Sequence, residues 1–256
     1  MSLEWEERTV KRGDQEIFFK VAGEGPLVVM FHGGLGNGTS DLIDTGIVEP
    51  FAEGFQIAVP DSLGHGRSSK PADPALYQMD QRAADNIAVV DALGVEKAWF
   101  FGYSMGGWTC GAMAKHYPER CAGMAVAGWD LENGMYTGAP PLGVEEVDYD
   151  VLIAAAKAVV PQLVEWITPE VEPGLREAIN AINSFEGAAD AVAALNVPVL
   201  IWAGYDDPYH DPMLDYARRN AMPFLSTPGD HTNAGMMHGT TAMANIAGWI
   251  RHLSTL

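Results

Sequence analysis

Short runs of apolar residues alternate with segments of helical spacing through most of the chain. The apolar runs occupy positions 17–21, 27–31, 56–60, 98–101, 123–127 and 197–203. Apolar side chains recur at helical intervals in 80–93, 104–116 and 242–253. Because strands that are buried on both faces read as continuous apolar runs, the pattern predicts an α/β fold, with a mostly parallel sheet and helices on both of its faces.

One region breaks this alternation. Positions 129–186 contain no run that is typical of a strand, and the segment 132–143, rich in Gly and Pro, predicts a loop. Helices are expected at 149–167 and 175–182, with Pro161 kinking or ending the first of them. The region therefore predicts a helical insertion between two strands of the sheet.

The charge balance narrows the range of partners. The 256 residues include 34 acidic and 15 basic side chains, a net charge of −19, and 48% are hydrophobic. That hydrophobic share supplies a packed core and excludes disorder for the body of the chain. A strongly anionic surface repels phosphate backbones and anionic lipids, so neither a nucleic acid nor a membrane is expected as a partner. A small-molecule substrate is expected, and assembly into a homo-oligomer stays open.

Cysteine content and apolar run length bear on the cellular compartment. Two cysteines, Cys110 and Cys121, are too few for a disulfide framework and lie in apolar stretches, so we expect both to be buried in the core. Positions 1–20 are charged and lack the apolar run of a signal peptide. No apolar run reaches the ~20 residues that a membrane helix needs. These features predict a soluble, cytoplasmic protein.

The segment 98–116 carries the most informative motif. It reads as a strand, then Gly102-Tyr103-Ser104-Met105-Gly106, then a helix, which is a G-x-S-x-G pattern in its expected context. So tight a turn forces Ser104 into a strained backbone conformation and leaves room only for glycine two positions away on each side. The helix N-terminus that follows favours a developing negative charge. The motif predicts that Ser104 is a nucleophile, although the pentapeptide alone also occurs by chance.

Two glycine-rich loops follow other predicted strands. His32-Gly33-Gly34-Leu35-Gly36 follows the run at 27–31. Acyl transfer needs two amide donors for the tetrahedral oxyanion, and we assign them to the N–H groups of Gly34 and Met105. We expect His32 to orient this loop. The loop 61–68 contains His65 and Arg67, which we expect to have structural roles.

A serine nucleophile needs a general base and an acid that orients the base. Two adjacent carboxylates, Asp206 and Asp207, follow the strand at 197–203, and His231 lies in a loop before the last helix. We expect His231 to be the base, with His238 as its competitor. His210, beside the acid loop, is expected near the pocket, whereas His116 and His252 lie in exposed helical contexts.

These separated elements together resemble the α/β-hydrolase superfamily. The resemblance covers nearly the whole chain, through His32-Gly33-Gly34, the segments 61–68 and 102–107, the Asp207 loop and His231, in the family's order. In that family the acid usually stands three residues after the glycine that ends its strand, which favours Asp207 over Asp206. The resemblance also implies that 1–129 and 187–256 form the hydrolase core and that 130–186 is a helical cap, or lid.

The resemblance implies a serine hydrolase of the carboxylesterase type that acts on a small, neutral substrate and needs no cofactor or metal. Relatives that use an aspartate nucleophile are disfavoured by Ser104, and Leu35 departs from the proline that is typical of proline iminopeptidases. Carbon–carbon bond hydrolase, lactonase and aminopeptidase activities remain alternatives, as does a ligand sensor with slow turnover. The residues expected to line the pocket are Tyr103, Trp129, Met135, Tyr136, Trp166 and Tyr209.

Overall fold

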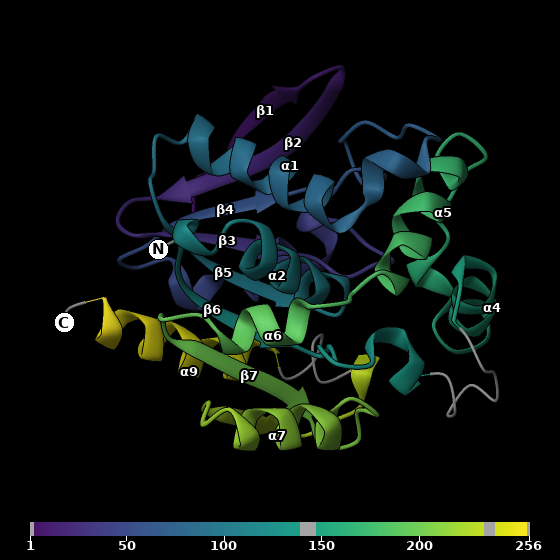
Figure 1. The fold of residues 1–256 in the computed structure, drawn as a ribbon. Coiled ribbons are helices and arrows are strands. Elements are labelled where there is room, and N and C mark those ends of the chain that lie inside the picture. The colour runs from purple at the N-terminus through teal and green to yellow at the C-terminus, as the bar shows by residue number, and fades with distance from the viewer. Residues whose placement is uncertain (1–2, 139–146, 233–238, 255–256) are drawn as a thin grey trace.

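The computed structural model describes residues 3–138, 147–232 and 239–254. These residues form an eight-stranded sheet with the order β1-β2-β4-β3-β5-β6-β7-β8 (Figure 1). The strands are β1 (Glu6–Arg12), β2 (Gln15–Gly23), β3 (Leu27–Phe31), β4 (Gln56–Pro60), β5 (Ala98–Tyr103), β6 (Cys121–Ala127), β7 (Val199–Gly204) and β8 (Phe224–Thr227). β1 and β2 pair antiparallel, β2 pairs antiparallel with β4, and the pairs from β4 to β8 are parallel. The predicted α/β class with a mostly parallel sheet is therefore confirmed.

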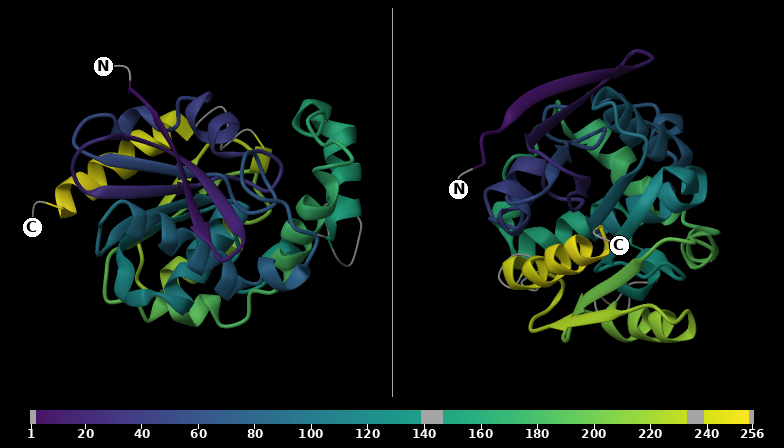
Figure 2. Two further views of the ribbon diagram at one scale, coloured as in Figure 1. Left: turned by 90° about the horizontal axis from the view of Figure 1, so that it is seen from above. Right: turned by 90° about the vertical axis from the view of Figure 1, so that its left-hand side faces the viewer.

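The longer helices are α1 (Met79–Ala92), α2 (Met105–His116), α4 (Tyr149–Val159), α5 (Glu172–Asn180), α6 (Ala188–Ala193), α7 (His210–Arg219) and α9 (Gly239–Leu253). Short helical turns are η1 (Thr39–Ile43), η2 (Glu49–Phe51), η3 (Pro74–Tyr77), η4 (Pro118–Arg120), η5 (Gly134–Gly138), η6 (Pro161–Leu163) and η7 (Ala181–Asn183). The β1–β2 hairpin lies at one end of the molecule and α7 with β8 at the other (Figure 2).

Each central strand supplies side chains to two separate cores. On β3, Val29 and Phe31 belong to the core under α1, α2, α6 and α7, whereas Val28 and Met30 belong to the core under α9. Alternation of side chains along a strand sends successive residues to opposite faces. Because both faces are covered, the central strands read as continuous apolar runs.

The β1–β2 hairpin shows where the apolar pattern misses a strand. Only 17–21 of β2 was expected, and β1 was not expected, because its sequence is charged and its side chains are exposed or half-buried. Charged side chains are one way in which proteins protect an edge strand from pairing with other chains. An edge strand of this kind lacks the apolar signal that marks the buried strands.

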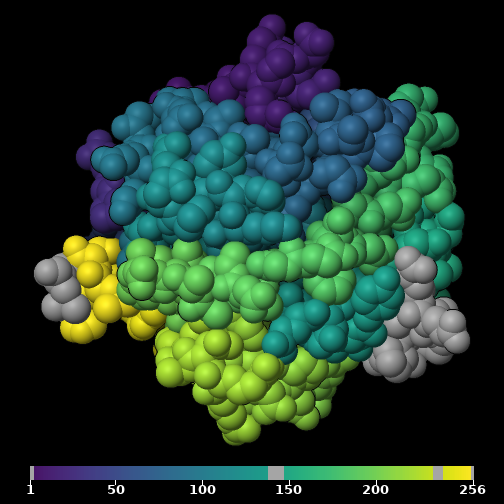
Figure 3. Space-filling view, viewed as in Figure 1, coloured from purple at the N-terminus to yellow at the C-terminus, as the bar shows by residue number. Residues whose placement is uncertain are grey.

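The region between β6 and β7 is helical, and no strand occurs among its described residues 128–138 and 147–198. The first expected helix ends as α4 at Val159, since Pro161 begins the separate turn η6. η5 occupies part of the expected loop 132–143, whose positions 139–143 lie outside the described residues. Figure 1 shows α4 and α5 beyond the carboxyl ends of the strands, and residues 172–193 run from there to α6 as a green band across one face (Figure 3).

Candidate active site

The strand register brings four loops to one edge of the sheet. Phe31 pairs with Gly102 in β5, Tyr103 pairs with Ala127 in β6, and Ala127 pairs with Trp202 in β7. The loops that begin after Phe31, Tyr103, Ala127 and Gly204 therefore start side by side, although 173 positions separate Phe31 from Gly204 in the sequence. Ligands of open α/β sheets bind at this carboxyl edge.

Ser104 occupies the sharp turn between β5 and α2. Its φ of 58° and ψ of −120° lie in a region that non-glycine residues rarely adopt. Its amide donates to Ala127 O at 2.9 Å, which ties the turn to β6. A Cβ on Gly102 would lie 1.9 Å from Gly106 O, and one on Gly106 would lie 2.3 Å from Phe31 O. Both glycines are therefore required by direct backbone contact.

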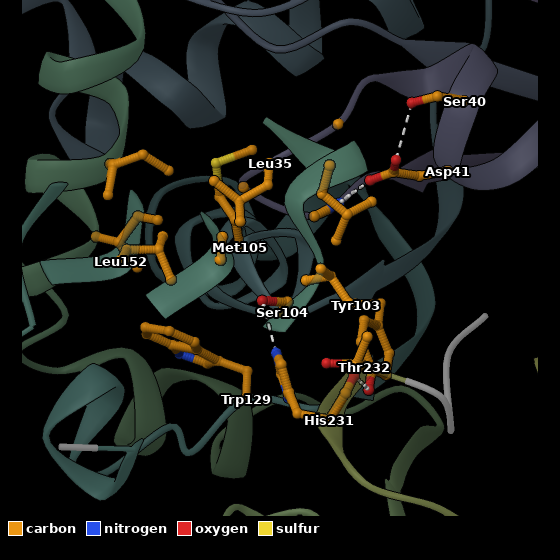
Figure 4. Close-up of a pocket in the computed structure, with 18 of the residues that line it drawn as sticks. Leu35, Ser40, Asp41, Tyr103, Ser104, Met105, Trp129, Leu152, His231 and Thr232 are labelled. Atoms are coloured by element: carbon orange, nitrogen blue, oxygen red, sulfur yellow. Dashed lines mark hydrogen bonds between the residues drawn. The ribbon is translucent and has the colours of Figure 1, made fainter. Parts of the chain in front are cut away.

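His231 and Asp207 complete a chain of hydrogen bonds from Ser104. His231 Nε2 lies 3.1 Å from Ser104 Oγ (Figure 4). On the other side of the ring, His231 Nδ1 lies 2.9 Å from Asp207 Oδ2. The other oxygen of Asp207 accepts the Tyr209 amide at 3.0 Å, and the side chain is buried. Asp206 is exposed, so the structure brings Asp207 rather than Asp206 to the histidine.

Two tyrosines fix the position of the His231 ring. The Tyr103 ring stacks on it with the centroids 5.3 Å apart and the planes at 28°, and Tyr209 approaches at 5.1 Å and 59°. The Tyr103 hydroxyl also donates to His231 O at 2.6 Å. The sequence indicated both tyrosines as pocket residues but not as supports of the histidine, because ring contacts between loops leave no sequence pattern.

The loop after β3 is held by three side chains. Asp41 Oδ2 accepts the Gly33 amide at 3.1 Å, His32 Nδ1 lies 2.7 Å from Gly33 O, and His65 Nε2 lies 2.9 Å from Gly34 O. Since the Ser62 amide donates to His32 Nε2 at 3.0 Å, the proton of His32 is on Nδ1 and donates to Gly33 O. Gly33 O and the Gly34 N–H belong to one peptide group, so His32 sets the orientation of that N–H.

The two histidines behind this loop are electrostatically unusual. His32 and His65 are fully buried, and their rings meet edge to face with centroids 4.9 Å apart. Burial lowers the pKa of His32 and lowers that of His65 well below its usual value. Both rings are therefore neutral near pH 7. The ring of His32, with one hydrogen bond donated and one accepted, fits this neutral form.

A cavity of about 460 Å³ lies over Ser104. Its floor is formed by the strand-end loops, with Gly34, Met105 and His231, and one wall by η1 and the residues after it. The helical insertion covers it with apolar side chains, among them Val147, Leu152, Ala156, Val160, Leu163, Trp166, Ile179 and Ile182. The insertion also contacts the floor, because Trp166 Nε1–H donates to Leu35 O at 2.8 Å. A Cβ on Gly34 would lie 2.8 Å from Ile179 Cδ1, so the insertion packs closely over this glycine.

Five of the six side chains expected in the pocket line this cavity, namely Tyr103, Trp129, Met135, Trp166 and Tyr209. Tyr136 does not, since it is 45% exposed and its ring lies against Phe185. η5 turns successive side chains in different directions, so Met135 faces the cavity while Tyr136 faces out.

His210 and Arg67 have structural partners away from the cavity. His210 does not reach the cavity, since its ring bonds Ser226 Oγ at 2.9 Å and Asp211 at 2.8 Å. Arg67 pairs with Glu7 and covers the Phe18 ring, a structural arrangement. His238 lies outside the described residues.

Sequence reasoning missed the aliphatic residues of the insertion that face the cavity, such as Leu152 and Ile179, and it missed Asp41. The apolar stripes of the two insertion helices were the available signal for the first group. Nothing in the sequence marks Asp41, because its place in the cavity depends on how η1 folds against the loop after β3.

Within residues 3–138, 147–232 and 239–254, no group of three or more His, Cys, Asp or Glu side chains could hold a metal ion. None of the helices in these residues is both long and apolar enough to cross a membrane. Cys110 and Cys121 are both buried free thiols, as expected from the sequence.

Known proteins resemble this chain in sequence and in structure. A family profile described as alpha/beta hydrolase fold matches residues 26–167. A 3-oxoadipate enol-lactonase of Acinetobacter baylyi is 32% identical over 176 residues, which cover 62% of this chain and 64% of that protein, just under two thirds of its length. A bifunctional esterase/perhydrolase of Acinetobacter calcoaceticus is 27% identical over 75% of this chain and 79% of its own. The structure of an enol-lactonase from Burkholderia xenovorans superposes with a TM-score of 0.74 at 17% identity, covering 95% of this chain and all of that one.

Proposed function

The chain belongs to the alpha/beta hydrolase fold family, and on that premise we propose that it is a serine hydrolase of the carboxylesterase type. It cleaves an ester or related acyl bond of a small, neutral substrate through an acyl-enzyme on Ser104. The observation that carries the proposal is the hydrogen-bonded series from Ser104 through His231 to buried Asp207 at the floor of the cavity.

The first half of the reaction forms the acyl-enzyme. Ser104 Oγ attacks the carbonyl carbon while His231 Nε2 accepts the hydroxyl proton, and Asp207 stabilises the imidazolium and holds the Nδ1–H tautomer. The carbonyl oxygen becomes an oxyanion that accepts the N–H groups of Gly34 and Met105. Gly34 and Met105 are neighbours, since a Cβ built on Gly34 would lie 3.8 Å from Met105 Cβ. The bond to the leaving group then breaks as His231 returns the proton to it.

The second half regenerates the serine. Water attacks the acyl carbon, His231 accepts a proton from that water, and the acid leaves as Ser104 Oγ recovers the proton. Each oxyanion donor contributes about 100- to 1,000-fold in rate in comparable enzymes.

The helical insertion acts as the cap of this site. We assign residues 130–186 to the cap and residues 1–129 and 187–256 to the catalytic core. The assignment is supported by the apolar side chains of α4, η6 and α5 that face Ser104 across the cavity. Such a lining favours an apolar acyl or alcohol portion, since a pocket binds mainly through apolar contact with a few placed polar groups.

A lactonase is the second candidate, favoured by the match to an enol-lactonase in sequence. The same residues would open a lactone, with the leaving oxygen tethered to the acyl group until water releases the hydroxy acid. A panel of linear esters and lactones of matched size separates the two activities by their kcat/KM values.

The nucleophile assignment is tested by covalent labelling and turnover. We expect a fluorophosphonate to label the protein and p-nitrophenyl acetate to give steady hydrolysis. Both are lost in Ser104→Ala, with kcat reduced by about 10⁶-fold, as in comparable enzymes. Ser254→Ala, at the far end of the chain, is the matched control and retains both activities.

Three outcomes would contradict parts of the proposal. Labelling that persists in Ser104→Ala would exclude this nucleophile. Full activity of His231→Ala together with loss in His238→Ala would exclude His231 as the base. A single slow turnover with strong thermal stabilisation by the ligand would indicate a sensor rather than an enzyme.

A further inference from the structure

The described lining of the cavity contains one acidic side chain and no lysine or arginine. The acidic side chain is that of Asp41. The segments 139–146 and 233–238, outside the described residues, contain no lysine or arginine in their sequence. A substrate carboxylate would therefore meet no cationic side chain here, whereas a substrate cation would meet Asp41.

Asp41 is held in place without an ion-pair partner. Its Oδ2 accepts the Gly33 amide at 3.1 Å and its Oδ1 accepts the Ser40 hydroxyl at 2.9 Å, as Figure 4 shows. No lysine or arginine of the described residues forms a salt bridge with it. A carboxylate offers roughly four acceptor positions, so part of that capacity remains for a ligand.

Asp41 lines the same cavity as Ser104. Gly33 lies next to both residues, since a Cβ built on it would lie 3.4 Å from Asp41 Oδ2 and 3.9 Å from Ser104 Cβ. A Cβ on Gly36 would overlap Asp41 Oδ1, so the glycines of this loop leave room for the acid. Burial raises the pKa of Asp41, which is the expected consequence of a carboxylate whose charge is incompletely compensated.

We propose that Asp41 makes this cavity select substrates that carry an ammonium group near the scissile bond and disfavour substrates that carry a carboxylate there. The proposal rests on the proposed serine hydrolase function, and it replaces the neutral substrate given there with one that carries a positive charge. It also separates this chain from the relative whose name specifies 3-oxoadipate, a carboxylate compound.

Electrostatic attraction between an ammonium group and the Asp41 carboxylate acts within the cavity. The net charge of −19 attracts cations to the whole surface, but salt screens that field, with a Debye length of about 3 Å at 1 M. An ammonium group in contact with a partly buried carboxylate is screened much less. A preference for ammonium over neutral substrates that remains at 1 M NaCl is therefore caused by the cavity rather than by the charge of the surface.

The test compares matched esters at 1 M NaCl. The first set is choline butyrate, its neutral isostere 3,3-dimethylbutyl butyrate, and a butyrate ester with a carboxylate at the same position. A second set carries the same three groups in the acyl half. In at least one set we expect kcat/KM to be at least tenfold higher for the ammonium than for the neutral ester, and tenfold lower for the carboxylate.

Asp41→Asn preserves the shape of the side chain and removes its charge. We expect the ratio of ammonium to neutral kcat/KM to fall to within threefold, whatever happens to the absolute rates. Asp44→Asn, an exposed residue at the end of the same turn, is the control and retains the wild-type ratio. Equal loss for all three esters in Asp41→Asn would overturn the proposal, because Asp41 would then act only by holding the Gly33 loop.

Binding separates this proposal from the proposed function. Calorimetry on Ser104→Ala and on the Ser104→Ala, Asp41→Asn double variant measures the affinity for the same esters without turnover. Tighter binding of the ammonium ester that is lost in the double variant supports the role of Asp41 even if the wild type hydrolyses nothing. Absence of any ammonium preference in the wild type, in rate and in binding, overturns the proposal even if Asp41→Asn fails to fold.

Discussion

At the scale of single residues, the site depends on side chains that other side chains hold in position. The His231 ring contacts the rings of Tyr103 and Tyr209, and Asp207 is buried with both carboxylate oxygens in hydrogen bonds. Rate depends on such orientation, because a small displacement of a reacting group raises the barrier strongly. The supporting contacts are therefore as much a part of the site as the reacting atoms.

The two adjacent aspartates give a direct test at this scale. Asp207→Asn keeps the side-chain size but favours the wrong tautomer of His231, so we expect kcat for p-nitrophenyl acetate to fall about 10⁴-fold, as in comparable enzymes. Asp206→Asn changes an exposed carboxylate that makes no contact with His231, and its kcat should match the wild type. Equal effects of the two substitutions would show that the histidine is oriented by another group.

At the scale of elements, the turn between β5 and α2 needs empty space at Gly102. A methyl group there would lie 1.9 Å from Gly106 O, a backbone atom that moves only with the helix. Gly248 is the contrast, since it lies on the exposed side of α9 with no atom within 4 Å of a Cβ. The same substitution therefore has opposite consequences at the two positions.

Urea unfolding measures the difference. Gly102→Ala should lower the free energy of unfolding by about 3 kcal/mol or more, the upper range for overpacking. Gly248→Ala should raise it by up to about 1 kcal/mol, because alanine is the better helix former. A stable, active Gly102→Ala protein would mean that the turn tolerates a side chain, contrary to the structure.

Much of the element order could be read from the sequence, and each exception has its own physical cause. The buried strands and α1, α2 and α9 were expected because apolar spacing reports burial directly. β1 was missed because it is charged. Of the two effects expected of Pro161, kinking or ending the first insertion helix, the structure shows the second, since α4 ends at Val159. Tyr136 was placed in the cavity because the sequence does not give the direction in which a short helical turn points a side chain.

At the scale of the whole molecule, the two buried histidines couple the site to global stability. Burial lowers the pKa of His32 and of His65, so the unfolded chain binds protons that the folded chain does not. The contribution of the two neutral histidines to stability is complete above pH 6.5, which is about the pKa of histidine in the unfolded chain. It is lost as the pH falls below that pKa. Burial raises the pKa values of Asp41 and Asp85. These two carboxyls therefore add stability as the pH falls toward the pKa of about 4 that they have in the unfolded chain.

We therefore expect the free energy of unfolding to fall between pH 6.5 and 5.5 by up to about 1.4 kcal/mol for each of these histidines. Urea titrations across this range measure the slope. His65→Gln should flatten it, whereas His252→Gln, at an exposed position of α9, should leave it unchanged. An equal slope in wild type and His65→Gln would show that His65 does not carry this dependence.

The α/β class, the order of the motifs and the residue types at Ser104, Asp207 and His231 could be read from the amino-acid sequence, because apolar periodicity and tight glycine turns are local properties. Which residues meet depends on the folded chain. Parallel register brings the loops after β3, β5, β6 and β7 to one edge, packing places two tyrosine rings against His231, and η1 brings Asp41 to the cavity over Ser104. Contacts between segments so far apart along the chain depend on the whole fold, and no local pattern records them.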